Sequence, residues 1–226
     1  MFAKSKKSTL RELPVLLVSA LILSVIVKTF FVQFFYIPSG SMENTLLVND
    51  RVGVNKFGAL FSDIKRGEVV VFRDPANWLT PTYDDKTGLS KVIRDGLVFV
   101  GVLPDPGKQY LIKRVIGVGG DRVVCCNADG KIEVNGKAIN EPYIYPGDKA
   151  SDSNFDVKVP QDFIWVMGDH RGASADSRFH TDDPNQGMVP LEKVTGRATF
   201  IVWPWKNIGL LEVGKDLSEV PVKQKP

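Results

Sequence analysis

The chain has 226 residues, of which 43% are hydrophobic and 24% are charged, and its formal net charge is +3. This length is enough for one large domain or two small ones with a substantial core. A net charge this small, without a long basic run interleaved with aromatic residues, excludes nucleic acid as an expected partner.

The N-terminal region predicts a membrane anchor. No charged residue occurs between Leu13 and Val27, and beyond Lys28 the apolar run continues to Ile37. A helix over residues 13–35 would be roughly 34 Å long, which is enough to span a lipid bilayer. A secretory signal peptide has a shorter apolar region that ends in a small-residue cleavage site, so the sequence favours an uncleaved anchor.

The charges beside this anchor predict its orientation. Four basic residues precede it, namely Lys4, Lys6, Lys7 and Arg11. The positive-inside rule therefore places residues 1–12 in the cytoplasm and the chain after Tyr36 outside. We expect a single-pass protein of the plasma membrane with an extracytoplasmic domain over residues 36–212. Residues 213–226 are expected to form a mobile C-terminal tail.

The region after the anchor is predicted to be mostly β. Runs rich in β-branched and aromatic residues, separated by turn signals, predict strands over residues 67–73, 110–118, 121–125, 131–139, 163–169 and 196–203. Asn135-Gly136 is typical of a hairpin turn. Residues 76–88 and 140–156 indicate loops or insertions, and a short helix is predicted over residues 89–100.

The two cysteines and two histidines predict neither a disulfide nor a metal site. Cys125 and Cys126 are adjacent, so their Cα atoms would be about 3.8 Å apart, below the disulfide range of roughly 4.4–6.8 Å. Neighbouring side chains in a strand also point to opposite faces, which favours two free thiols. His170 and His180 occur in no metal-ligand spacing, so no metal is expected.

Ser39 and Ser41 lie on either side of Gly40, just after the predicted anchor. Pro, Ser and Gly together are typical of a turn. A serine at this place is also a candidate nucleophile for an exported hydrolase, which needs a base to accept its proton.

Two kinds of base remain open from the residues alone. His170 and His180 allow a Ser-His pairing, whereas Lys113 allows a Ser-Lys pairing in which a desolvated lysine is neutral enough to act. By strand alternation, Lys113 shares a face with Leu111 and Val115. Burial between apolar neighbours lowers the pKa of a lysine, which suits the second pairing.

Four sequence boxes occur in a characteristic order. They are SGSM (39–42), RGEVVVF (66–72), KRVIGVGGD (113–121) and GDHRGASADSR (168–178). Their order and approximate spacing after one N-terminal anchor resemble those of bacterial signal peptidase I. The resemblance runs from the anchor through about residue 205. It implies a mostly β fold, with a signal peptidase-type antiparallel β catalytic domain and a smaller β extension inserted over about residues 126–160.

The resemblance also implies roles for individual residues. Ser41 would be the nucleophile, Lys113 the general base, and Ser39 an oxyanion-hole donor beside the backbone N–H of Ser41. The supporting residues would be Ser174, which orients the lysine, the ion pair of Asp176 and Arg178, and, in structural roles only, Asp169 and Arg171. The chain departs from the commonest family pattern at positions outside this set, namely Gly119, His170, Gly172 and Ala173.

The substrate follows from this resemblance and from the predicted location. A hydrolase tethered at the outer membrane surface reaches bonds near that surface, where translocated signal peptides end. We expect a serine endopeptidase that removes signal peptides from exported preproteins after small-x-small (Ala-x-Ala-like) sites, without a cofactor or metal. Trp203, Trp205 and Trp78 are candidates for docking on the lipid bilayer, with ordinary packing as the alternative.

Three other functions remain open. The first is a specialised relative that processes a single pilus or conjugation client. The second is a self-cleaving transcriptional repressor, which would need a DNA-binding helical domain where this chain has its predicted anchor. The third is an anchored β-domain that only binds partners. The third predicts that Ser41 or Lys113 is missing, and both are present.

Overall fold

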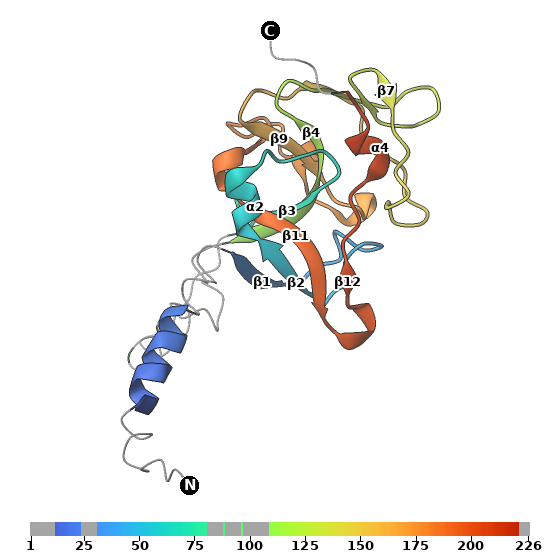
Figure 1. Cartoon of the computed structure of the whole chain (residues 1–226). Coiled ribbons are helices and arrows are strands. Elements are labelled where there is room, and N and C mark those ends of the chain that lie inside the picture. The colour runs from blue at the N-terminus through green and yellow to red at the C-terminus, as the bar shows by residue number, and fades with distance from the viewer. Residues whose placement is uncertain (1–11, 24–30, 81–87, 89–95, 97–108, 222–226) are drawn as a thin grey trace.

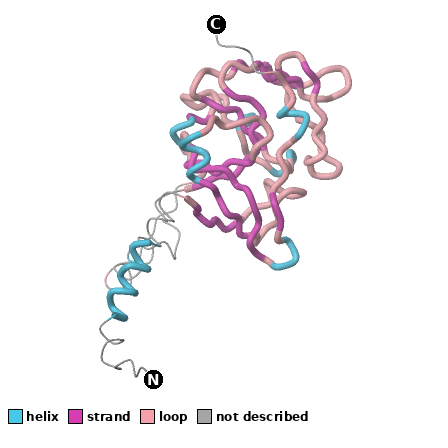
Figure 2. Tube along the Cα trace, viewed as in Figure 1, coloured by secondary structure: helices cyan, strands magenta, loops and turns pink. Residues whose placement is uncertain are grey.

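A computed structural model of the chain describes residues 12–23, 31–80, 88, 96 and 109–221 (Figure 1). Strands make up most of the regular structure after residue 31, and the helical segments are short (Figure 2). Every strand pair is antiparallel. The prediction of a mostly β, antiparallel fold is therefore confirmed.

The strands of the larger sheet bring together segments that are far apart in the sequence. In spatial order they are β1 (Val32–Tyr36), β2 (Arg51–Asn55), β11 (Val194–Trp203), β3 (Val69–Arg73), β4 (Tyr110–Val118), β9 (Phe163–Met167) and β10 (Val189–Pro190), and β12 (Gly209–Leu210) pairs with β11. β4 therefore lies between β3 and β9, near the middle of the sheet. The four predicted strands of this sheet coincide with β3, β4, β9 and β11.

A second, smaller sheet has four strands. Their order is β7 (Lys137–Ala138), β6 (Glu133–Val134), β5 (Arg122–Cys125) and β8 (Phe155–Lys158). The strands of this sheet lie between Arg122 and Lys158, whereas the sequence predicts a β extension over about residues 126–160. β8 overlaps the end of the segment 140–156, which was predicted to be a loop. The strand was not predicted because its four residues, which alternate between half-buried and exposed, are too short a run to recognise in the sequence.

Six short helical segments have defined bounds in the part of the chain after residue 31 that the structure describes. They are α2 (Lys56–Phe61), α4 (Lys215–Ser218), and the 3₁₀ helices η1 (Arg171–Ala173), η2 (Ser177–Phe179), η3 (Leu191–Lys193) and η4 (Trp205–Asn207). The side chain of Asn55 caps the start of α2 by accepting a hydrogen bond from the backbone N–H of Gly58. The helix predicted over residues 89–100 lies almost entirely outside the described residues.

The predicted anchor helix over residues 13–35 is wrong at its C-terminal end. Residues 12–23 are helical, but residues 32–35 belong to β1, which pairs with β2. An apolar, aromatic run is compatible with either a helix or a buried strand, and here pairing with β2 decides. Within the described part of the chain, no helix has both the length and the apolar character to cross a bilayer.

Residues 213–221 do not form the mobile tail that the sequence predicts. Leu217 and Val220 are buried in the core cluster that contains Trp165 and Met167. The guanidinium of Arg66, itself buried, donates a hydrogen bond of 2.6 Å to the carbonyl of Val220. Two apolar side chains within a polar segment were too weak a signal to reveal this packing.

Two further expectations are corrected. Cys125 and Cys126 are joined by a disulfide, with Cα atoms 3.0 Å apart rather than the spacing of a trans peptide, so the prediction of two free thiols is wrong.

Trp78 is only 8% exposed, and its indole N–H donates to Asp183 at 2.7 Å. It packs inside the domain and is not available to contact a bilayer.

Candidate active site

Ser41 lies in a tight turn that follows β1. The turn is closed by backbone hydrogen bonds from Glu43 N–H to the Gly40 carbonyl and from Leu46 N–H to the Met42 carbonyl. Met42 and Leu46 are completely buried in the cluster beneath the turn. These two buried side chains fix the backbone of the turn, and the Ser41 side chain is held in place with little exposure to solvent.

Lys113 lies on β4 and is also buried. It pairs in register with Val70 of β3, and Val70 belongs to the same apolar cluster as Leu111 and Val115. The strand alternation that the sequence predicts therefore places the lysine between apolar neighbours. Its Nζ lies 2.6 Å from Ser41 Oγ, which brings together two side chains separated by 72 residues in sequence.

Burial lowers the pKa of Lys113 from 10.5 to about 8. The carboxylates of Asp176 and Asp169 act in the opposite direction, because they favour the charged amine, and the Arg178 guanidinium adds to the lowering. Burial is the largest of these effects. A substantial fraction of the Lys113 amine is therefore neutral near pH 8, and a neutral amine can accept a proton from a hydroxyl.

Asp176 organises the loop beside this pair. It is completely buried and accepts hydrogen bonds from the Ser174 hydroxyl at 2.8 Å and from the backbone N–H of Gly168 at 2.9 Å. Arg178 donates to both of its oxygens, from Nε at 2.8 Å and from Nη2 at 2.9 Å. The predicted ion pair of Asp176 and Arg178 is therefore present as a bidentate pair, and Ser174 is tied to it.

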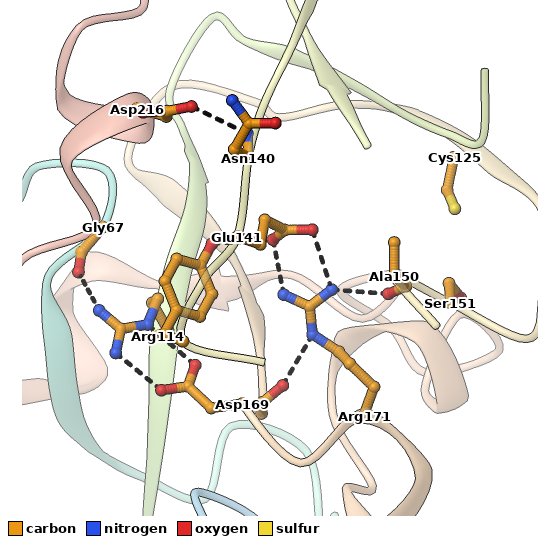
Figure 3. Close-up of polar contacts among 12 residues, drawn as sticks. Gly67, Arg114, Cys125, Asn140, Glu141, Ala150, Ser151, Asp169, Arg171 and Asp216 are labelled. Carbon is orange, nitrogen blue, oxygen red and sulfur yellow. Dashed lines mark hydrogen bonds and ion pairs between the residues drawn. The ribbon is translucent and has the colours of Figure 1, made fainter. Parts of the chain in front are cut away.

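A second buried ion pair joins Arg114 to Asp169 (Figure 3). Arg114 donates to the two carboxylate oxygens at 2.8 and 2.7 Å, and Thr45 Oγ1 donates to one of them at 2.5 Å. Because Thr45 lies four residues after Ser41, this pair connects the turn that carries Ser41 with the strand that carries Lys113. The family resemblance implies only a structural role for Asp169, and nothing in the sequence marks Arg114 or Thr45 as its partners.

Arg171 forms a third buried pair, with Glu141 at 2.6 Å (Figure 3). It also donates to the backbone carbonyls of Gly168 and Ala150. Glu141 lies in the segment predicted to be a loop or insertion, and its contact with Arg171 was missed. An isolated glutamate in a polar stretch carries no sequence signal for a buried partner.

The remaining predicted site residues have different environments. Ser39 is exposed in the same turn as Ser41. The imidazole of His170 is 3.0 Å from the Glu43 carboxylate, and that of His180 stacks on Trp78, so both rings have partners other than Ser41. Within the described residues, no group of three or more His, Cys, Asp or Glu side chains is arranged to hold a metal ion.

Comparison with known proteins assigns the chain to a family. The family model described as "Signal peptidase, peptidase S26" matches residues 10–203. Signal peptidase I of Mycobacterium tuberculosis (strain ATCC 25618 / H37Rv) is 39% identical over 228 residues, which cover 92% of this chain and 77% of that protein. Probable signal peptidase I-2 of Synechocystis sp. (strain ATCC 27184 / PCC 6803 / Kazusa) is 36% identical over 208 residues, which cover 91% and 78%.

A solved structure of a signal peptidase I from Enterococcus faecalis V583 is 20% identical and covers 61% of this chain and 98% of that one, with a TM-score of 0.39. The family model spans most of the chain, and the curated relatives agree with it over nearly the whole length. The chain therefore belongs to the signal peptidase family, peptidase S26, and is a serine-type peptidase.

Proposed function

We propose that the chain removes signal peptides from exported preproteins with Ser41 as nucleophile and Lys113 as general base. The observation that carries the proposal is the 2.6 Å distance between Lys113 Nζ and Ser41 Oγ, both of which belong to buried residues. A serine hydroxyl is a weak nucleophile unless an adjacent base removes its proton. Lys113, with its pKa lowered to about 8 by burial, is suited to that task.

The reaction has two stages. In the first, neutral Lys113 takes the proton of Ser41 Oγ while Oγ attacks the carbonyl carbon of the scissile bond. The resulting oxyanion accepts hydrogen bonds from the Ser39 hydroxyl and the backbone N–H of Ser41, and charged Lys113 then protonates the departing amine. In the second stage, Lys113 activates a water molecule that hydrolyses the acyl-enzyme and releases Ser41.

The supporting residues keep the base in place. Ser174 donates its hydroxyl proton to Asp176, so its oxygen lone pairs can accept a hydrogen bond from the charged Lys113 amine. Asp176 and Arg178 form a buried ion pair, so Arg178 offsets part of the effect of the Asp176 carboxylate on the lysine. We expect substrates with small residues before the cleaved bond, bound in extended form by strand addition.

The proposed location is the outer surface of the plasma membrane. The apolar side chains of the N-terminal helix, from Leu13 to Leu23, are exposed, as expected for a segment that contacts lipid. At one end of the larger sheet, Trp203 and Trp205 are 44% and 76% exposed, and the nearby Leu210 is 83% exposed. Exposed tryptophans beside other apolar residues favour docking on lipid headgroups.

The decisive experiment is cleavage of a preprotein by the full chain purified in detergent. Ser41→Ala and Lys113→Met should each abolish cleavage while the melting temperature stays close to that of the wild type. Ser218→Ala and Lys158→Met are matched controls at exposed positions and should cleave normally. Near-normal turnover by folded Ser41→Ala or Lys113→Met would contradict the proposed dyad.

A further inference from the structure

Residues 141–145, which lie between β7 and β8, contact the Ser41 turn, His170 and the buried arginines Arg114 and Arg171. We propose that this segment, the brace, holds the Ser41 turn in register with Lys113, and that Asn44 and Tyr145 are positioning residues for the reaction. The inference rests on the proposed function, because it assumes that Ser41 is the nucleophile.

The first contact of the brace is with the Ser41 turn itself. Asn44 lies three residues after Ser41, and its side-chain amide donates hydrogen bonds of 3.1 Å to the carbonyls of both Tyr143 and Ile144. The backbone of Asn44 has a positive φ of 81°, a conformation that few residues other than Gly, Asn and Asp adopt. An asparagine therefore suits this position twice, for the backbone bend and for the two amide donors.

The second contact reaches Ser41 through His170. The ring of Tyr145 stacks on the ring of His170 with centroids 4.0 Å apart, and the backbone N–H of Tyr145 donates to the Asp169 carbonyl at 2.9 Å. The backbone N–H of His170 in turn donates to the carbonyl of Ser41 at 3.2 Å. Tyr145 thus contacts both His170, which holds the Ser41 backbone, and its neighbour Asp169.

The third contact anchors the brace to buried charges. Glu141 pairs with Arg171 (Figure 3). It also accepts a hydrogen bond of 2.8 Å from the Tyr143 hydroxyl. The ring of Tyr143 lies beneath the Arg114 guanidinium, 4.1 Å from its carbon to the ring centroid. Burial, the larger cause, and the Glu141 carboxylate raise the pKa of Tyr143 well above 10, so this phenol keeps its donor proton.

These contacts make the brace rigid at one end and attach it to the Ser41 turn at the other. The anchoring side chains of Glu141, Arg171 and Arg114 are nearly inaccessible to solvent, so that end has little freedom to move. The Asn44 side chain and Tyr145 are exposed, so removing either one leaves the core unchanged. A small displacement of a reacting group lowers the rate steeply, which is why these exposed contacts matter for catalysis.

The test compares Asn44→Gly and Tyr145→Ala in the full chain with the wild type. Glycine tolerates the positive φ, so Asn44→Gly removes only the amide hydrogen bonds. Each substitution should lower kcat about 10-fold, as expected for contacts worth about 1–1.5 kcal/mol, with KM nearly unchanged. The acidic limb of the pH profile should stay near 8, because neither change alters the burial of Lys113.

Asn135→Gly is the matched control. Asn135 also has a positive φ, of 54°, and its side chain makes hydrogen bonds to Asp121 and Arg122 in the hairpin of the smaller sheet. Asn135→Gly should lower the melting temperature at least as much as Asn44→Gly and leave kcat unchanged. An equal loss of kcat in Asn135→Gly would overturn the proposal, since general destabilisation would then account for both.

The two proposals fail in different ways. If Ser41→Ala is inactive while Asn44→Gly and Tyr145→Ala keep the wild-type kcat, the brace has no role in positioning and the proposed dyad stands. If Ser41→Ala remains active, the proposed function itself is wrong. A rise in KM without a fall in kcat would also overturn the brace, because it would indicate a role in substrate binding.

Discussion

Gly168 lies directly against Ser174. A Cβ built on Gly168 would be 2.2 Å from Ser174 Oγ and 2.5 Å from the backbone oxygen of Ser41, closer than real contacts allow. The absence of a side chain at residue 168 is therefore what lets the Ser41 turn and the Ser174 loop approach one another. The sequence marks this glycine only as part of a box.

We expect Gly168→Ala to impair both activity and stability. The added methyl group must push the Ser41 turn and the Ser174 loop apart, which should cost about 1–3 kcal/mol of folding free energy. Displacement of the reacting groups by even part of an ångström should lower kcat by roughly 10²-fold. Gly209→Ala is the control, because its Cβ would meet only the Asn207 carbonyl, at 4.0 Å. Equal kcat values for the two variants would contradict the tight contact.

The pH dependence of kcat/KM should report the pKa of Lys113. A lysine base works only when neutral, so the rate of the free enzyme should rise with pH, bend near 8 and level off above it. With a histidine base, the profile would instead bend at a pH of about 6.5. His170→Ala and His180→Ala should leave the limb in place. A limb near 6.5 that disappears in either variant would show that the base is histidine.

Removing the carboxylate of Asp176 should move this limb. Asp176 favours the charged amine of Lys113 and so raises its pKa, whereas Arg178 lowers it. In Asp176→Asn the first effect is lost and the second remains, so the acidic limb should shift to lower pH. The variant should also lose stability, because it leaves Arg178 buried without its bidentate partner. A limb that shifts to higher pH would contradict this account of the lysine.

The Ser39 hydroxyl should contribute to kcat. Ser39→Ala removes a donor that would stabilise the oxyanion, and loss of one such donor typically lowers kcat by about 10²–10³-fold. Because Ser39 is exposed, the melting temperature should not change. Steady-state kinetics with a preprotein decide the matter, and an unaltered kcat would mean that the donor lies elsewhere.

Trp203 and Trp205 should contact lipid in the reconstituted full chain. Their fluorescence should be quenched by brominated lipids, and the quenching should be lost in the double variant Trp203→Phe/Trp205→Phe. Trp78 and Trp165 are buried and serve as internal controls that the same lipids should not quench. Quenching that persists in the double variant would dismiss this surface as the docking site.

The sequence alone determined the local features of this protein. Strand β4 was predicted to the residue, because its nine residues are rich in β-branched and other apolar side chains and end just before the turn residues Gly119 and Gly120. The four boxes marked Ser41 and Lys113 as candidate site residues, and the alternation of Leu111, Lys113 and Val115 predicted that the lysine is buried, as it is in the structure. The sequence did not predict strand β2, because Gly53 at its centre is typical of a turn. In the structure this glycine leaves room for the ring of Phe200, which a Cβ would meet at 2.3 Å.

Only the tertiary structure decided which distant residues meet. The sequence marked Asp176 and Arg178 as a pair two residues apart, whereas Glu141 and Arg171 are 30 residues apart and nothing in either segment indicates the other. Leu217 became part of the core because the C-terminal segment packs against the same cluster as Trp165. The lowered pKa of Lys113 likewise depends on burial in the folded domain, since desolvation is a property of the packed environment and not of the residue.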